Sequence, residues 1–226
     1  MGVAARLLAA VLAGGAVMIV TGCGSSPAMQ LAASKLLTSM QDSVRGAESV
    51  HISGRLTSNG VPVAVDLGVH RDGDMAGTIS QNGAAFNVIG VDGKVFVQAT
   101  PAFLREMGAP ARACAVVCGK WVQLPPRQAG QLTGDLSMTS MTGLLASGHL
   151  PKFSAAGSSI VGGQSAWVLR ANDGSMLDVS SRGVHYPLEA MTAGTSRDTL
   201  RYSQWNSVPS PSAPPAKQVL SLSGVP

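Results

Sequence analysis

Three cysteines are the residues of this chain best able to do covalent chemistry, and the first, Cys23, stands at a boundary in composition. Before it, a single cation, Arg6, is followed by an almost unbroken apolar run from Leu7 to Val20. A run of this length is typical of a secretory signal peptide and is short for a membrane span. We therefore expect residues 1–22 to direct export and to be removed, which leaves Cys23 at the new amino terminus.

The residues around Cys23 predict that its thiol is lipidated. Val20-Thr21-Gly22-Cys23 resembles the bacterial lipobox, in which the thiol takes a diacylglyceryl group and the new amino terminus is acylated, with palmitate as the expected chain. Two or three chains anchor a protein stably, because each buried methylene contributes about 0.8 kcal/mol, whereas one chain binds reversibly. We expect a protein anchored on the extracytoplasmic face of the cell membrane, with residues 23–29 as a short tether.

The other two cysteines, Cys114 and Cys118, form the sequence Cys-Ala-Val-Val-Cys. An exported chain meets an oxidising compartment, in which such a close pair normally forms a disulfide. A redox pair would need Cys-x-x-Cys spacing at a helix start, and a zinc site would need a second pair of ligands. The sequence therefore predicts a structural disulfide that closes a small loop and contributes roughly 2 kcal/mol.

The remaining polar residues show no catalytic or metal-binding pattern. HExxH, GxSxG, SxxK and the phosphate-binding glycine motifs are absent from the sequence. Several aspartates stand beside turn glycines, where their side chains cap the backbone. The histidines are scattered along the chain: His51, His70, His149 and His185. We expect no enzyme activity, no cofactor and no metal site.

Composition sets further limits. Without the 22 leader residues, 204 of the 226 remain, which is enough for one domain with a sizeable core. Charged residues make up 12%, aromatic residues 4% and hydrophobic residues 45%, which argues against a disordered chain and against a nucleic-acid partner bound by base stacking. The formal net charge of +4 is a small excess that is spread along the chain, and it is weak evidence for an acidic partner.

Hydrophobic periodicity predicts one helix followed by a β-meander. From Gln30 to Ala47 apolar residues recur every three or four positions, as on one face of an amphipathic helix. From Val50 the period changes to two, as in half-buried strands. The alternating runs are separated by dipeptides typical of tight hairpin turns: Asn59-Gly60, Asp72-Gly73, Asn82-Gly83 and Asp92-Gly93.

The middle of the chain interrupts this pattern. We expect a short helix at 101–108, the cysteine loop, an edge strand at 119–125 and a second helical patch at 136–145. Alternation resumes from Phe153 to Asn206. The expected organisation is a single domain over 30–208 and a disordered Pro/Ser-rich tail over 209–226.

These elements predict an α+β fold, in which a large antiparallel sheet curls into a half-barrel and helices pack over its concave face. If the helices fill that face only partly, the remaining volume is an apolar cavity of the kind that accepts acyl chains.

The order and spacing of several segments resemble the mycobacterial LppX/LprG lipoproteins, whose fold is similar to the LolA/LolB lipoprotein carriers. The likeness runs from Leu31 to Val208 and is carried by the lipobox, the leading helix, Ser49-Val50-His51-Ile52, Val91-Asp92-Gly93-Lys94-Val95-Phe96, Gly119-Lys120-Trp121-Val122, Val161-Gly162-Gly163-Gln164 and Tyr202-Ser203-Gln204-Trp205-Asn206. The resemblance implies a LolA-like half-barrel with a cavity for multi-acyl lipids or lipoglycans, which the protein would carry across the cell envelope. A membrane transporter would be a further partner. The Cys114/Cys118 loop departs from that family, so the identity of the ligand is not carried over.

The residues expected to line the cavity lie on the inward faces of the early strands and of both helices. They are Leu37, Met40, Val44, Val63, Val65, Leu67, Met75, Ile79, Met141, Leu144 and Leu145. The alternative for each is an ordinary core position. The alternative function is a non-enzymatic envelope sensor or assembly module, which would have a closed core and would bind a protein partner.

Overall fold

The structure is a computed structural model that describes residues 27–58, 60–106, 108–147, 150–194 and 198–220. The predicted signal peptide and Cys23 lie outside the described residues. The helices are α1 (Pro27–Gly46), α2 (Pro101–Glu106), α3 (Ala111–Val117), α4 (Pro126–Leu136), α5 (Met138–Ala146) and the 3-10 helix η2 (Ala216–Gln218). The strands are β1 (Ser49–Ser58), β2 (Val61–His70), β3 (Met75–Gln81), β4 (Ala84–Val91), β5 (Lys94–Ala99), β6 (Trp121–Gln123), β7 (Phe153–Val161), β8 (Gln164–Ala171), β9 (Met176–Ser180), β10 (Pro187–Met191), β11 (Thr199–Ser203) and β12 (Val219–Leu220).

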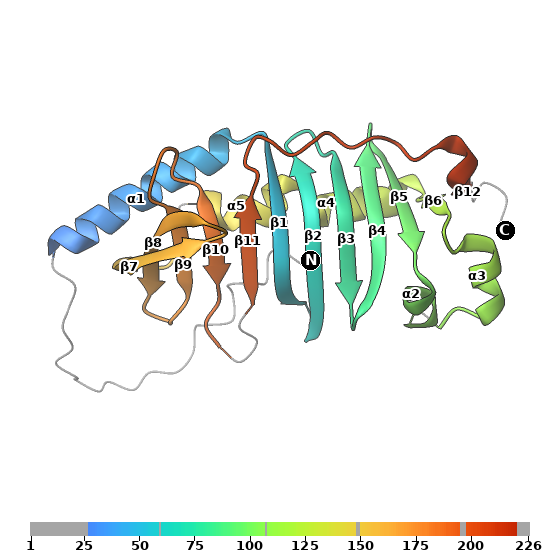
Figure 1. Ribbon diagram of the computed structural model, residues 1–226, viewed down its shortest axis with the longest axis horizontal. Coiled ribbons are helices and arrows are strands. Elements are labelled where there is room, and N and C mark those ends of the chain that lie inside the picture. Colours follow the sequence, from blue (N-terminus) through green and yellow to red (C-terminus); the bar gives the residue numbers. More distant parts are fainter. Residues whose placement is uncertain (1–26, 59, 107, 148–149, 195–197, 221–226) are drawn as a thin grey trace.

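Within the described residues, the strands form one 12-stranded sheet in the order β12-β6-β5-β4-β3-β2-β1-β11-β10-β9-β8-β7. Neighbouring strands are antiparallel except β12 and β6, which are parallel. The pairing of β1 with β11 joins the strands that precede the middle helices to those that follow them (Figure 1).

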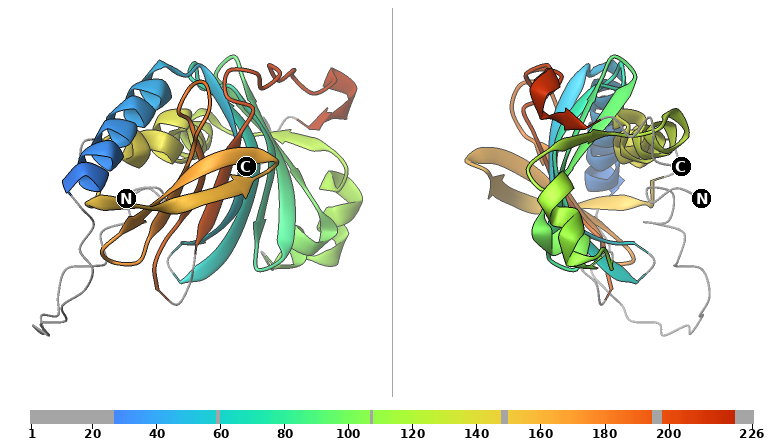
Figure 2. Two further views of the ribbon diagram at one scale, coloured as in Figure 1. Left: turned by 60° about the vertical axis from the view of Figure 1, so that its left-hand side comes forward. Right: turned by 90° about the vertical axis from the view of Figure 1, so that its right-hand side faces the viewer.

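Helices α1, α4 and α5 pack on one face of this sheet, which we call the helix-covered face, while α2 and α3 lie beyond its β5 end (Figure 2). The predicted α+β class, with an antiparallel sheet and helices on one face, is confirmed. The sheet is open and uncurled, however, rather than rolled into a half-barrel. The right-handed twist between adjacent strands adds up over so many strands that β7 and β8 lie across the direction of β2 (Figure 1).

The hairpin turns form where the sequence predicted them. Asn82 and Asp92 adopt positive φ angles of 50° and 51°, each followed by a glycine that also has positive φ. These angles suit the primed turns whose twist matches that of the flanking strands. The first helix begins at Pro27, inside the predicted tether, because the fixed φ of proline suits the first helical position.

The cysteine loop is helical rather than irregular. Cys114 lies in α3 and Cys118 follows its last residue, and the predicted disulfide between them is present, with a Cα–Cα distance of 4.7 Å. Side chains four positions apart in a helix lie on the same face, so the bond closes one helical turn.

The chain beyond Val208 is ordered as far as Leu220, in contrast to the predicted disordered tail. It runs along the top of the strands in Figure 1, and the side chain of Val208 packs directly over Gly68. Val219 then pairs with Trp121, so β6 is an inner strand and not the predicted edge. A proline-rich segment can be held in this way because it packs on an existing sheet and needs no core of its own.

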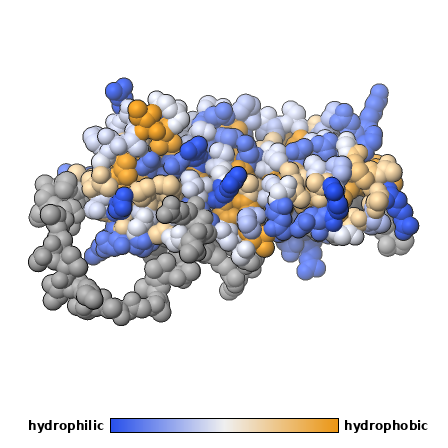
Figure 3. Space-filling model, turned by 60° about the horizontal axis from the view of Figure 1, so that its bottom comes forward, coloured by the Kyte–Doolittle hydropathy of each residue, from blue (hydrophilic) through white to orange (hydrophobic). Residues whose placement is uncertain are grey.

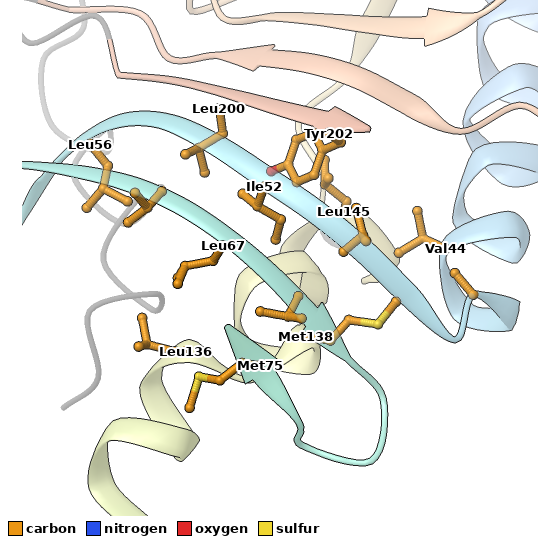
Figure 4. Packing of buried hydrophobic residues seen from close by; sticks show 14 of the residues in the cluster. Val44, Ile52, Leu56, Leu67, Met75, Leu136, Met138, Leu145, Leu200 and Tyr202 are labelled. Carbon is orange, nitrogen blue, oxygen red and sulfur yellow. The ribbon is translucent and has the colours of Figure 1, made fainter. Parts of the chain in front are cut away.

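Buried side chains from both halves of the sheet meet the helices in one core. Met40 of α1, Ile52 of β1 and Leu67 of β2 are fully buried. Figure 4 shows Met75 and Met138 together where the sheet meets α4 and α5, with Leu56 and Leu200 at the other end of β1. The two ends of the helix-covered face are therefore packed differently.

Candidate functional site

A cavity of about 520 Å³, partly open to solvent, lies between the sheet and helices α4 and α5. Its walls are mostly apolar and come from β1, β2, β3, β4, β9, β10 and β11, with α4, α5 and the start of β7 opposite them. Figure 3 brings the bottom of the Figure 1 view forward. On that side of the molecule, hydrophobic side chains gather in the middle between hydrophilic ones.

The cavity exists because α4 and α5 cross the strands and cover only part of their length (Figure 1). Helices α4 and α5 have 11 and 9 residues and are interrupted at Ser137, whose hydroxyl caps α5 by accepting from the Ser140 backbone N–H at 3.1 Å. A helix that lies across the sheet covers a band about 10 Å wide, which is about a third of the length of a ten-residue strand (Figure 1). Side chains at the far ends of the strands therefore face empty space.

Six of the eleven predicted cavity residues line this space, and they come from β2, β3 and α5: Val63, Val65, Ile79, Met141, Leu144 and Leu145. The other five pack in the core and are not part of the lining: Leu37, Met40, Val44, Leu67 and Met75. On β2 the two groups share one face, because Val63, Val65 and Leu67 are two residues apart. Leu67 and Met75 lie farther along their strands than the residues that line the cavity.

Sequence reasoning missed the wall contributed by the second half of the chain. It includes Met176 of β9, Met191 of β10, and Leu200 and Tyr202 of β11. The alternation of these strands indicated which residues share a face. The strands that flank the cavity are brought there by the pairing of β1 with β11. This pairing joins residues about 150 positions apart, such as His51 and Ser203, and no local sequence pattern specifies it.

The polar groups of the lining are hydroxyls, one amide and two carboxylates, and no lysine or arginine is among the described lining residues. Asp198 is buried, and its Oδ1 accepts a hydrogen bond from the Thr57 hydroxyl at 2.9 Å. Asp135 of α4 is half-buried. A site with this charge disfavours an anionic group within it and accepts hydroxyl or ammonium donors.

Tyr202 brings a polar atom to the inner wall of the cavity. Its side chain is 4% exposed, and burial raises its pKa far above the usual range, so the phenol stays protonated. Its hydroxyl points toward the side where Leu56 and Leu200 lie, which is part of the cavity wall (Figure 4). A phenol at the surface of the cavity can donate a hydrogen bond to an acceptor of a ligand or of water.

A serine, a histidine and an aspartate also meet on the opposite face of the sheet. His51 Nε2 lies 2.7 Å from Asp66 Oδ1, and His51 Nδ1 lies 3.1 Å from Ser203 Oγ. The three side chains stand on neighbouring flat strands, and the Asp66 side chain is 69% exposed. The three residues are not among those that line the cavity.

Across the described residues, no group of three or more His, Cys, Asp or Glu side chains is placed to hold a metal ion. None of the helices in this part of the chain is long and apolar enough to cross a membrane.

Two solved structures share this fold. LprF from Mycobacterium bovis aligns with a TM-score of 0.56 and 13% identity over 84% of this chain and 99% of that one. The Mycobacterium tuberculosis lipoprotein LppX aligns with a TM-score of 0.50 and 16% identity over 80% of this chain and 97% of that one. No protein-family model and no curated protein matches the sequence. This chain thus shares the fold of these mycobacterial lipoproteins, as the resemblance to the LppX/LprG lipoproteins predicted, although its sheet is open rather than rolled into a half-barrel.

Proposed function

We propose that this protein is an envelope lipoprotein, anchored through Cys23, that binds acylated lipids or lipoglycans in the cavity and carries them across the cell envelope. The observation that carries the proposal is the mostly apolar cavity of about 520 Å³ between the sheet and helices α4 and α5. Its volume is in the range of small-molecule sites, which are concave and largely apolar with a few polar groups. Apolar surface facing water favours a ligand that covers it.

The lining also suits chains of different length and shape. Three methionines face the cavity, Met141 of α5, Met176 of β9 and Met191 of β10. Methionine is unbranched and adapts to irregular apolar partners at little cost. The described lining residues include two carboxylates and no cation. This charge favours a lipid that places an uncharged group with hydroxyls inside the cavity.

The alternative, a sensor or assembly module that binds a protein partner, rested on a closed core. A sensor or assembly module does not require a partly open apolar cavity, and none of the described contacts favours a protein-binding function.

Lipid extraction tests the proposal directly. Residues 24–226, produced without the leader in a bacterial host and purified without detergent, should retain about one acylated lipid per protein molecule, since the cavity accommodates one ligand. Organic extraction followed by mass spectrometry measures the amount and identifies the chains. A chain that stays free of lipid after expression, and after incubation with diacylglycerol or glycolipid, would show that the cavity binds something else.

Removing the Tyr202 hydroxyl should weaken binding of ester lipids selectively. The change Tyr202→Phe deletes one hydrogen-bond donor of about 0.5–1.5 kcal/mol and keeps the ring, so affinity for dioleoylglycerol should fall about two- to ten-fold. Affinity for the dialkyl ether analogue, which lacks the carbonyl acceptor, should be unchanged. Calorimetric titration of both lipids measures the two effects. An equal loss for both would assign Tyr202 to packing alone.

A further inference from the structure

The positive charge of this chain comes from one segment. Residues 93–134 contain five of the 16 lysines and arginines and one of the 12 acidic residues, so their net charge of +4 equals that of the whole chain. The rest of the sequence is balanced. The excess is therefore concentrated, contrary to the even spread assumed from composition.

The fold gathers this charge at one end of the molecule. Four of the cations lie on elements at the β5–β6 end of the sheet (Figure 1): Arg105 of α2, Arg112 of α3, Lys120 before β6 and Arg127 of α4. Lys217 joins them, because β12 pairs with β6 and brings η2 alongside. We call these five side chains and the surface of α3 the basic end. It lies at the opposite end of the long axis from the start of α1 (Figure 1).

The five cations have no internal role in the described structure. All are exposed, and the ion pairs found among the described residues use other cations. Glu106, the one acid of the segment, accepts a hydrogen bond from the Asn82 side chain at 2.9 Å. Exposed cations without ion-pair partners at one end of a molecule create a positive potential there, which an anionic partner stabilises.

An exposed apolar side chain accompanies the charge. Val116 is 64% exposed, and it lies four residues after Arg112 and therefore on the same face of α3. Figure 3 shows pale orange side chains bordered by blue at the right-hand end of the molecule, where α3 lies. Apolar and cationic side chains on one exposed helix face are typical of surfaces that bind the interface of a membrane.

We infer that the basic end is a docking surface for an anionic phospholipid membrane. A fluid layer of phosphate headgroups matches cations that are spread over several elements and aligned in no groove, and it accepts the Val116 side chain between headgroups. The contact would also bring a lipid layer close to the cavity, since Phe103 of α2 packs against Phe86 of the cavity wall with ring centroids 4.7 Å apart. The docking itself does not depend on which ligand the cavity holds.

Vesicle co-sedimentation tests this inference. Residues 24–226, which carry no lipid anchor when made without the leader, are mixed with vesicles of phosphatidylcholine alone or of phosphatidylcholine with phosphatidylglycerol. We expect binding only to the vesicles with phosphatidylglycerol, and loss of binding at high salt, where the charges are screened. Failure to bind those vesicles, or equal binding to both kinds, would overturn the inference. Stronger binding to soluble heparin than to the vesicles would assign the surface to a polyanion instead.

Matched charge variants locate the surface. Each cation near an anionic membrane contributes about five-fold in affinity, so Arg112→Gln combined with Lys120→Gln should reduce binding by about 25-fold. The control combines Arg55→Gln and Arg182→Gln, two exposed cations outside the basic end, and should change affinity less than about two-fold at the same net charge. Equal losses in the two variants would mean that net charge, and not the basic end, causes binding. Lipid content after purification should be the same in both, which separates this result from the test of the cavity.

Discussion

Replacing Met141 with tryptophan is expected to remove nearly all co-purified lipid while leaving the domain folded. Met141 is half-buried on α5 and its side chain faces the cavity. The larger indole would occupy space that is empty in the protein, so it would cost little stability and would compete with the ligand for the same volume. The extracted lipid should fall at least about ten-fold, and the midpoint of thermal unfolding should change by only a few degrees.

The matched control is Met138→Trp, on the same helix. Met138 is 4% exposed and packs in the core, where an added ring has no space. Overpacking of this kind costs about 1–3 kcal/mol, so this variant should lose stability and retain its lipid if it folds. Met75→Trp should behave in the same way, because Met75 is buried and its side chain lies 3.1 Å from the position a Cβ on Gly90 would occupy. If Met141→Trp unfolds the protein as Met138→Trp does, the cavity is not an open site.

The sequence predicts which residues face the helices, but it does not predict which of them line the cavity. Alternation along β2 was sufficient to place Val63, Val65 and Leu67 on the face that meets the helices. Turn dipeptides such as Asn82-Gly83 were sufficient to define the hairpins and hence the order of β1 to β5. Both signals are local, because side-chain direction and turn geometry are set by residues within a few positions of one another.

Whether an inward-facing residue packs in the core or lines the cavity is not decided by its sequence neighbours. Val65 and Leu67 are both buried, but Val65 lines the cavity and Leu67 does not, because of where α4 and α5 cross the strands (Figure 1). That crossing depends on the break at Ser137 and on the packing of α5 against α1. The ordered tail is a similar case. Its prolines exclude regular structure of their own, and only the presence of β6 beside it provides a strand for Val219 to pair with.

Charge differs between the two sites proposed for this molecule. The basic end carries cations without described ion-pair partners, whereas the described lining of the cavity carries Asp135 and Asp198 and no cation. An anionic phospholipid would therefore be attracted to the outside of the protein and disfavoured within it. A carrier with this arrangement could dock on an anionic membrane and still select a minor lipid with an uncharged head from it.

A large loss of stability is expected from Gly54→Ala, at the strand pair that joins the two halves of the sheet. Gly54 has a φ of 147°, which side-chain-bearing residues rarely adopt, and it pairs with Leu200 of β11. A Cβ built at this position would lie 2.1 Å from the backbone oxygen of Thr199, and backbone cannot move aside as a flexible side chain can. Relief of that overlap would separate β1 from β11 and open the cavity wall that Leu200 and Tyr202 form.

Gly157 provides the control that separates this overlap from backbone strain. Its φ of 141° is close to that of Gly54, and a Cβ there would meet nothing within 4 Å. Gly157→Ala should therefore cost only the strain of the unusual φ, about 1–3 kcal/mol, whereas Gly54→Ala should cost about 4 kcal/mol or more and prevent folding if the stability margin is small. Denaturant unfolding of both variants measures the difference. Equal losses would mean that β1 and β11 separate at this point with little cost, and that the two halves of the sheet are held together mainly by the helices.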